Sequence, residues 1–182
     1  MIQPDAHKHA IVRKLSIRRY RGLESLDWRP DPTLNLILGG GDVGKTTILD
    51  AVGLLLSASN ATTVSETDYW RRDNTTEFSV EGVVSLPEGV DPNSLSVLLM
   101  PWEWNGQDAV LPGNPQDGDV AEATNPVYRL RVRGTPELEL VWEVVQPDDS
   151  TMPLSAAFRK KIGLIRLSAD DRNDRDLRLV FG

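Results

Sequence analysis

The sequence predicts an α/β fold of mixed α+β character that is rich in strands and has one principal helix. A glycine-rich loop at residues 39–44 lies between a short apolar segment and a segment whose apolar residues recur at helical spacing. Much of the remaining chain alternates apolar and polar residues, as strands with one wet face do. Because strand–helix alternation does not continue after the predicted helix, residues 76–167 are predicted to form an antiparallel β subdomain.

The N-terminal part predicts two paired strands. Residues 11–20 alternate apolar and basic side chains, Arg21-Gly22 predicts a turn, and residues 23–28 can return as the partner strand. A third strand is expected at Thr33–Leu38, directly before the glycine-rich loop. A helix should follow the loop and end near residues 57–60, because apolar residues recur at helical spacing, namely Ile48, Leu49, Val52, Leu55 and Leu56.

The loop has the spacing of a phosphate-binding motif (P-loop, or Walker A), Gly39-x-x-x-x-Gly44-Lys45-Thr46. Glycines let backbone N–H groups converge on a phosphate, and the N-terminus of the following helix adds a partial positive charge. Lys45 is predicted to stabilise charge on the terminal phosphates as the catalytic side chain, and the Thr46 hydroxyl to bind Mg²⁺. The predicted nucleotide-binding residues are Gly39, Gly40, Gly41, Asp42, Val43, Gly44, Lys45, Thr46 and Thr47, with the Asp42 carboxylate directed away from the phosphates.

The predicted β subdomain is defined by alternating segments and turn residues. Its expected parts are a strand at 77–86, an apolar segment at 95–104, a tight turn at Asn105-Gly106, a loop at 112–126, a short helix at 154–161 and a last strand at 162–167. Trp102 and Trp104 precede the tight turn, so they are expected to cover the core; stacking on a base is the alternative.

A hairpin is predicted from residues 127–133 and 137–145, which flank Gly134-Thr135-Pro136. A register that pairs Arg133 with Glu137 also pairs Arg131 with Glu139, and it brings opposite charges together on the wet face. These arginines are therefore expected to be structural. The apolar face of the hairpin would bury Tyr128, Leu130, Val132, Leu138, Leu140, Trp142 and Val144.

Composition limits the classes of function. The 182 residues include no cysteine, which excludes disulfides, thiol catalysis and zinc-thiolate sites. No apolar run reaches membrane-spanning length, and the N-terminus lacks a signal-peptide core, so a cytoplasmic protein without membrane contact is expected. The net charge is −7, but residues 1–29 carry seven Lys or Arg and three acids, a net of +4, so the remainder carries −11. This basic segment either contacts DNA, a nucleotide or an acidic partner, or it is a solvated strand face.

The order of these motifs resembles the ATPase heads of the OLD, RecF and SMC families, which are ABC-type or AAA-type P-loop proteins. The matching residues are Arg18-Arg19-Tyr20-Arg21-Gly22, the loop from Gly39 to Thr46, and Leu49-Asp50-Ala51-Val52. The resemblance implies one head lobe over residues 1–182, with the nucleotide part at 11–60 and the β subdomain at 76–167. It further implies ATP and Mg²⁺ as cofactors, a homodimer formed through the ATP-bound head, and a DNA transaction such as repair, nuclease action or phage defence.

The sequence also departs from those families. Gly41 replaces their usual asparagine, and there is no LSGGQ-like signature and no apolar run ending in Asp-Glu. A switch histidine is also missing, since the two histidines of the sequence are His7 and His9. Two candidates for the missing Mg²⁺-binding acid are Glu103 and the pair Asp170-Asp171. The apolar runs before them are interrupted by Pro101 and Arg166, respectively. The sequence ends in an apolar stretch, so a fragment of a larger head is expected, and whether this chain hydrolyses ATP stays open. The alternatives are a non-catalytic nucleotide-binding module and a small P-loop kinase or GTPase, which would need an Asn-Lys-x-Asp motif or an arginine-rich lid.

Overall fold

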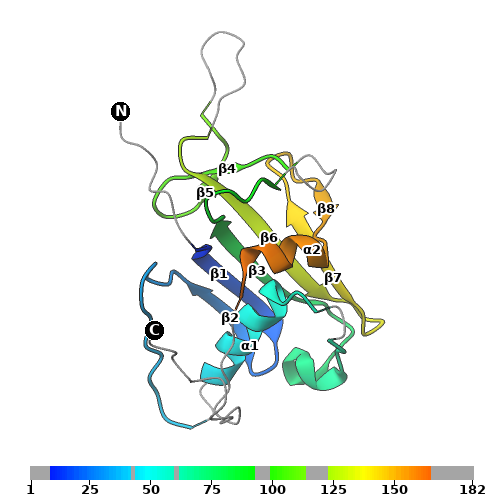
Figure 1. Cartoon of the computed structure of the whole chain (residues 1–182). Helices are drawn as coiled ribbons and strands as arrows, with labels where there is room; N and C mark the ends of the chain where they lie inside the picture. The colour runs from blue at the N-terminus through cyan, green and yellow to red at the C-terminus, as the bar shows by residue number, and fades with distance from the viewer. Residues whose placement is uncertain (1–8, 42–43, 60–61, 93–98, 114–122, 165–182) are drawn as a thin grey trace, which may run out of the picture.

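A computed structural model gives the arrangement of the chain for residues 9–41, 44–59, 62–92, 99–113 and 123–164 (Figure 1). The elements, in chain order, are β1 (Ile11–Tyr20), β2 (Leu23–Trp28), α1 (Lys45–Leu56), the short 3₁₀ turns η1 (Glu66–Asp68) and η2 (Trp70–Arg72), β3 (Phe78–Ser85), β4 (Trp102–Trp104), β5 (Ala109–Val110), β6 (Pro126–Gly134), β7 (Leu140–Val145), β8 (Thr151–Pro153) and α2 (Ala156–Ile162). This confirms a β-rich fold with one principal helix after the glycine-rich loop.

The strands form one eight-stranded sheet. Its main path runs β2-β1-β3-β6, and β7 and β8 continue from β6, while the β4–β5 hairpin joins the start of β6 through Trp102 and Val127. Every pair of neighbouring strands in the described parts of the chain is antiparallel. The predicted antiparallel subdomain is therefore continuous with the N-terminal hairpin, and the two parts share one sheet.

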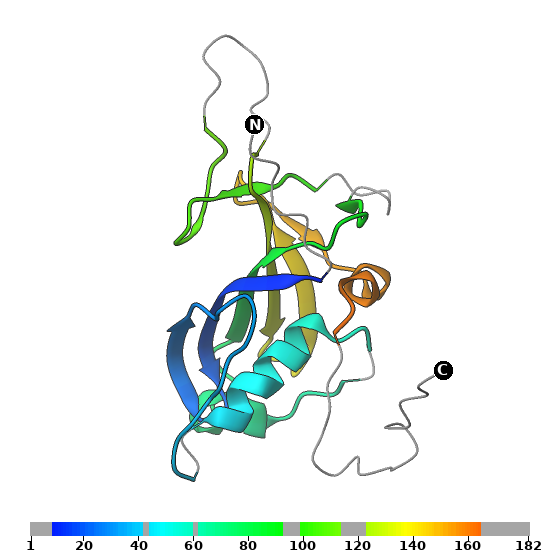
Figure 2. The same ribbon diagram turned by 60° about the vertical axis from the view of Figure 1, so that its left-hand side comes forward.

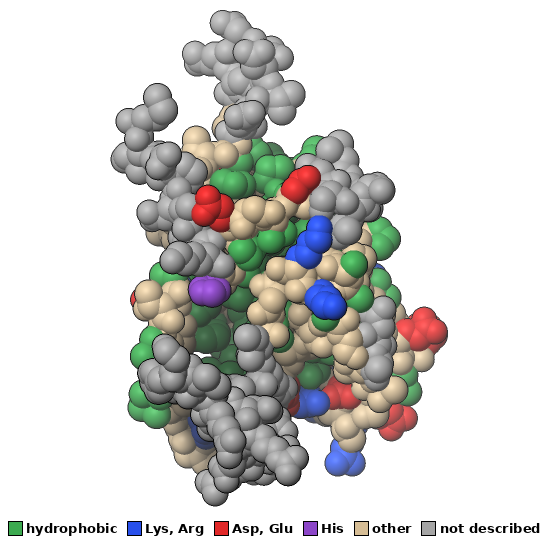
Figure 3. All heavy atoms as spheres, in the orientation of Figure 1, with side chains coloured by type: hydrophobic (Ala, Val, Ile, Leu, Met, Phe, Trp, Pro, Cys, Tyr) green, Lys and Arg blue, Asp and Glu red, His purple; other side chains and the backbone are tan. Residues whose placement is uncertain are grey.

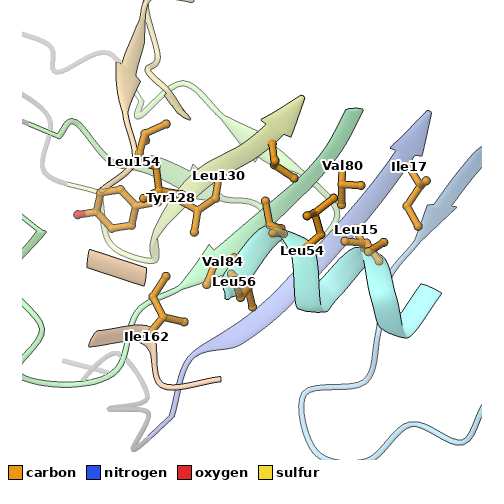
Figure 4. Packing of buried hydrophobic residues seen from close by; sticks show 14 of the residues in the cluster. Leu15, Ile17, Leu54, Leu56, Val80, Val84, Tyr128, Leu130, Leu154 and Ile162 are labelled. Atoms are coloured by element: carbon orange, nitrogen blue, oxygen red, sulfur yellow. The ribbon is translucent and has the colours of Figure 1, made fainter. Parts of the chain in front are cut away.

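Helix α1 lies across one face of this sheet (Figure 2). The main core forms between them, where Leu54, Leu55 and Leu56 of α1 meet apolar side chains that alternate along the strands; Figure 4 labels Leu15, Ile17, Val80, Val84, Tyr128 and Leu130 on the strands. Leu154, after β8, and Ile162, on α2, extend this core. Leu49, predicted to lie on the apolar stripe of the helix, is instead more than half exposed. A smaller core lies under the β4–β5 hairpin and consists of Val83, Trp102, Val127 and Val145.

At Gly82, α1 packs closely against the sheet. A Cβ atom at this position of β3 would lie 2.7 Å from Cδ2 of Leu55, a side chain that is fully buried. That separation is shorter than van der Waals contact allows, so the glycine permits the helix to pack at this distance. The core between β3 and α1 therefore depends on the missing side chain at position 82.

The opposite face of the sheet carries a row of paired charges. The Arg129 Nε atom donates to Glu81 at 2.9 Å, and Glu143 accepts from the Nε atoms of Arg131 at 2.6 Å and Arg133 at 2.7 Å. Glu143 is only 5% exposed. Burial alone would raise the pKa of Glu143, but hydrogen bonds from Arg133 and Arg131 outweigh it and hold the pKa below its ordinary value. These arginines are structural, as expected.

The predicted register of the β6–β7 hairpin is wrong by four residues. Arg131 lies opposite Glu143 and Arg133 opposite Val141, in place of Glu139 and Glu137. The turn is longer than predicted because Thr135 and Glu139 close a loop in which Leu138 takes a positive φ of 61°. Leu138 is consequently exposed. Because the shift is even, the apolar side chains of both strands keep the predicted face.

The strand predicted at Thr33–Leu38 is not formed. No described strand lies beside this segment, and Leu34, Leu36 and Leu38 are 81%, 79% and 78% exposed. An apolar segment becomes a strand only when a neighbour pairs with its backbone, which its own pattern does not supply. Asp31 instead organises the start of the segment by accepting from the backbone N–H of Thr33 at 2.8 Å.

Several other predicted elements are confirmed. Strands 11–20, 23–28 and 77–86 correspond to β1, β2 and β3, and the predicted helices correspond to α1 and α2. Asn105-Gly106 lies in the turn that joins β4 to β5. Trp102 is buried and its Nε1 donates to the Val145 carbonyl at 2.8 Å, which confirms its place in the core.

One expectation near the C-terminus is wrong. Ile162, predicted to begin a strand, is instead the last residue of α2, and the structure describes the rest of the predicted strand at 162–167 only as far as residue 164.

Among the described residues, no helix is long and apolar enough to cross a membrane.

Gly82→Ala is expected to lower the free energy of unfolding by about 1–3 kcal/mol, because the new methyl group overlaps Leu55. Chemical denaturation monitored by tryptophan fluorescence measures the change. Gly113→Ala is the matched control, since a Cβ there meets no atom within 4 Å. Equal stability of the two variants would contradict the close packing of α1 on β3.

Glu143→Gln is expected to destabilise the protein at pH 7 by about 1–3 kcal/mol, because two charge-assisted hydrogen bonds to a buried acceptor are weakened. The pKa of Glu143 is lowered on folding, so its contribution is present above the ordinary value of 4.5 and is lost as the pH falls through the lowered pKa. Urea denaturation across this pH range should show the two proteins converging in acid. Glu139→Gln, at the residue that the sequence alone pairs with Arg131, should leave the stability unchanged.

Candidate functional site

The glycine-rich loop leads directly into the N-terminus of α1. Gly44 takes a left-handed conformation, with φ 85° and ψ 10°, and its carbonyl accepts the first helical hydrogen bond, from Ile48 N at 3.0 Å. No side chain caps this end of α1, and its first turn carries no acidic residue. The first N–H groups of the helix therefore face outward with a partial positive charge, which suits an anion.

Lys45 folds back over the loop. Its ammonium donates to the Gly39 carbonyl at 2.9 Å and also to the carbonyl of Gly40. The side chain is thus held beside the backbone of the loop, and its charge lies at the N-terminal end of α1. A phosphate at this end would meet the ammonium and the helix N–H groups together.

The other predicted site residues fall into two groups. Gly39, Gly40 and Gly41 are exposed, and a Cβ at Gly40 or Gly41 would meet no atom within 4 Å, so the backbone there is open to a ligand. Thr46 is exposed and Thr47 half-buried on the first turn of α1. Asp42 and Val43 lie outside the residues that the structure describes, so the orientation predicted for Asp42 stays a prediction.

The far end of α1 is held by buried polar contacts. Arg159 of α2 donates through Nε to the Ser57 carbonyl at 2.6 Å, and Trp142 of β7 donates through Nε1 to the Leu54 carbonyl at 3.0 Å. The Arg159 guanidinium also lies 4.2 Å from the centroid of the Trp142 ring. Burial lowers the pKa of Arg159 from its ordinary value. A cation at the C-terminal end of a helix complements its dipole, so these contacts fix α1 while its N-terminus stays open.

A second cluster of charges joins the side of α1 to the β1–β2 turn. Arg21 of the turn donates through Nε to Asp68 Oδ1 at 2.8 Å, and its Nη1 pairs with Asp50 of α1. The sequence pattern indicated the Arg21-Gly22 turn and the position of Asp50 off the apolar stripe, but not their contact. Residues separated by 29 positions leave no local signal of pairing, so sequence analysis missed this cluster.

The described part of the chain contains no cluster of metal-binding side chains. No group of three or more His, Cys, Asp or Glu side chains gathers there. Glu103 accepts from Thr124 N at 2.8 Å and from the Thr124 hydroxyl at 2.9 Å, so it organises a loop next to β4. Asp170 and Asp171 lie outside the described residues. Thr46 therefore remains the predicted Mg²⁺ ligand of this site.

The sequence is similar to a known repair protein. Over 115 residues it is 34% identical to the DNA replication and repair protein RecF of Saccharophagus degradans, and this alignment covers 61% of the chain but 29% of that protein. No protein-family model matches the sequence. The chain thus spans less than a third of the length of this relative.

The fold is similar to that of a solved RecF structure. The structure of the recombination mediator protein RecF bound to ATP, from the RecFOR pathway, superimposes with a TM-score of 0.50 at 14% sequence identity. The match covers 82% of this chain and 30% of that chain. At this identity the comparison concerns the fold alone, and it supports a β-rich, RecF-like arrangement.

Gly44→Ala is expected to destabilise the protein by about 1–2 kcal/mol, because alanine is strained at φ 85° and its methyl group would lie 3.0 Å from Leu23 Cδ2. Thermal and urea unfolding measure the loss. Gly41→Ala serves as the control, since its Cβ meets open space. A stable Gly44→Ala variant would contradict the left-handed start of α1.

Proposed function

We propose that residues 39–47 bind the phosphates of ATP with Mg²⁺, and that the chain acts as the ATP-binding lobe of a RecF-like ATPase head. The observation that carries the proposal is the Lys45 ammonium, held against the loop carbonyls at the uncapped N-terminus of α1. Lys45 binds the β- and γ-phosphates, the Thr46 hydroxyl holds Mg²⁺, and Thr47 contacts the α-phosphate. Bound Mg²⁺ would neutralise the negative charge that develops on these phosphates.

The choice of ATP and of a DNA transaction is supported by the comparisons. The relative is a DNA replication and repair protein, and the structure with a similar fold was determined with ATP. These similarities favour a role in DNA repair or recombination over the nuclease and phage-defence roles of OLD-type proteins. Dimerisation of two ATP-bound heads is part of the same proposal, and it would bring a second copy or a further lobe to the nucleotide.

Contact with DNA is a weaker part of the proposal, because cations of β1 are paired within the chain. The Lys14 ammonium lies 2.5 Å from Asp108 Oδ2, and the Arg18 guanidinium lies 2.8 Å from both carboxylate oxygens of Asp27. On the face seen in Figure 3, positive and negative side chains of the described residues are scattered over the surface. The basic N-terminal segment therefore behaves largely as a solvated strand face, and DNA contact would need other surfaces of the complete head.

Lys45→Ala is expected to weaken binding of a non-hydrolysable ATP analogue with Mg²⁺ by about 10- to 100-fold, the worth of a charge-assisted phosphate contact. Isothermal titration calorimetry on the purified chain measures the affinity. Lys160→Ala is the matched control, because it removes an exposed lysine from the other α-helix.

Each outcome decides a part of the proposal. Binding that only Lys45→Ala weakens supports the phosphate site, and a parallel phosphate-release assay then separates an ATPase from a nucleotide-binding module. The absence of binding by the unaltered chain would contradict a functional site in this lobe. Equal loss in both variants would mean that the nucleotide is held by general charge and not by this loop.

A further inference from the structure

The turn between β1 and β2 is tied to two other segments through one side chain. Arg21 has a positive φ of 49°, a conformation that non-glycine residues seldom adopt. Its backbone N–H donates to the Asp68 carbonyl at 2.8 Å, and its Nε donates to Asp68 Oδ1 at 2.8 Å. Its Nη1 pairs with the carboxylate of Asp50 on α1. The guanidinium therefore bridges carboxylates from η1 and α1.

Burial makes this bridge costly to break. The side chains of Asp50 and Asp68 are 15% and 14% exposed, and that of Arg21 is 39% exposed. Burial opposes the charge of Arg21, but the hydrogen bond to Asp68 and nearby negative charges outweigh it and raise its pKa. Largely buried carboxylates need a counter-charge, and a strained backbone persists only where its surroundings fix it. The contacts of Arg21 meet both conditions.

Asp50 lies about one helical turn from the candidate phosphate site. It follows Thr46 by four residues on α1, so the two side chains lie on the same face of the helix, about one turn apart. A link from Asp50 to the sheet therefore fixes the rotation of α1 about its own axis at the turn next to Lys45 and Thr46. The contacts of Arg159 and Trp142 hold the other end of the helix, more than two turns away.

Among the residues that the structure describes, the bridge lies beside a cavity and is not packed on all sides. A cavity of about 330 Å³ opens next to it and is lined by Tyr20, Arg21, Asp50, Gly53 and Ser57, among others. This space has room for the guanidinium to leave Asp50.

We infer that Arg21 is a positioning residue for the nucleotide site, which acts through Asp50 by setting the rotation of α1 and hence the direction of the Thr46 hydroxyl. This inference rests on the proposed ATP and Mg²⁺ site. Arg21 does not touch the nucleotide. Thr46, the predicted Mg²⁺ ligand, lies on the same helical face as Asp50. Loss of the Arg21–Asp50 link should therefore weaken mainly the part of the nucleotide affinity that depends on Mg²⁺.

The test compares affinities for a non-hydrolysable ATP analogue with Mg²⁺ and with EDTA. Arg21→Gln and Asp50→Asn should each weaken binding with Mg²⁺ by about tenfold, and the double variant should be no weaker than either, because both remove the same link between Arg21 and α1. With EDTA the loss should be smaller. In a Thr46→Ala background, Asp50→Asn should have little further effect, and Arg21→Lys should recover part of the affinity of the unaltered chain.

Arg18→Gln is the matched control, since it makes the same substitution on β1 and breaks the pair with Asp27, which has no link to α1. Its affinity should be unchanged. Loss in Arg21→Gln without loss in Asp50→Asn, or losses that add in the double variant, would overturn the inference, because Arg21 would then act on the nucleotide directly.

Hydrogen exchange in nucleotide-free protein separates this inference from the proposed function. Asp50→Asn should speed amide exchange at Ile48–Ala51 by about tenfold, since the first turns of α1 lose a tether. Unchanged exchange overturns the inference whether or not nucleotide binds. If the unaltered chain binds no nucleotide, the proposed function fails, and faster exchange would still establish Arg21 as the group that fixes α1.

Discussion

The packing of α1 against the sheet at Gly82 is the constraint on which the rest of the structure depends. Without a side chain at this position, Leu55 comes close enough to β3 to close the core between the helix and the strands. The glycine-rich loop leads directly into this helix, and Gly44 at its end also lies close to Leu23 of β2. The packing of Leu55 against β3 at Gly82 therefore sets the position of the candidate phosphate site. The residues of the loop and of the first turn of α1 complete the site.

Polar contacts then decide how the packed helix is oriented. Side-chain donors of Arg159 and Trp142 occupy carbonyls at its C-terminal end, and Arg21 holds its side through Asp50. None of these contacts reaches the first turn, where the N–H groups stay available. An anion site at a helix N-terminus requires this arrangement, in which the C-terminal end and the side of the helix are fixed and its N-terminal N–H groups remain open to a ligand.

Local patterns were sufficient for some features and insufficient for others. The loop, the helix after it and the hairpins follow from glycine spacing, helical periodicity and alternation, all of which act over a few residues. The β6–β7 register depended on a left-handed Leu138 that lengthens the turn, and the predicted pairing of Arg131 with Glu139 failed for that reason. Residues 33–38 have the composition of a strand, but a strand also needs a neighbour. The Arg21–Asp50 contact joins distant segments, so it becomes visible only in three dimensions.

The exposed leucines at positions 34, 36 and 38 have a consequence for the behaviour of the chain in solution. An exposed apolar segment that pairs with no strand of the described sheet offers a template on which identical copies can add edge to edge. Repulsion between chains with a net charge of −7 opposes such addition at neutral pH. That repulsion fades as carboxylates become protonated and as salt screens them. The isolated chain is therefore expected to self-associate more readily as the pH falls toward its isoelectric point near 4.9 and as salt is added.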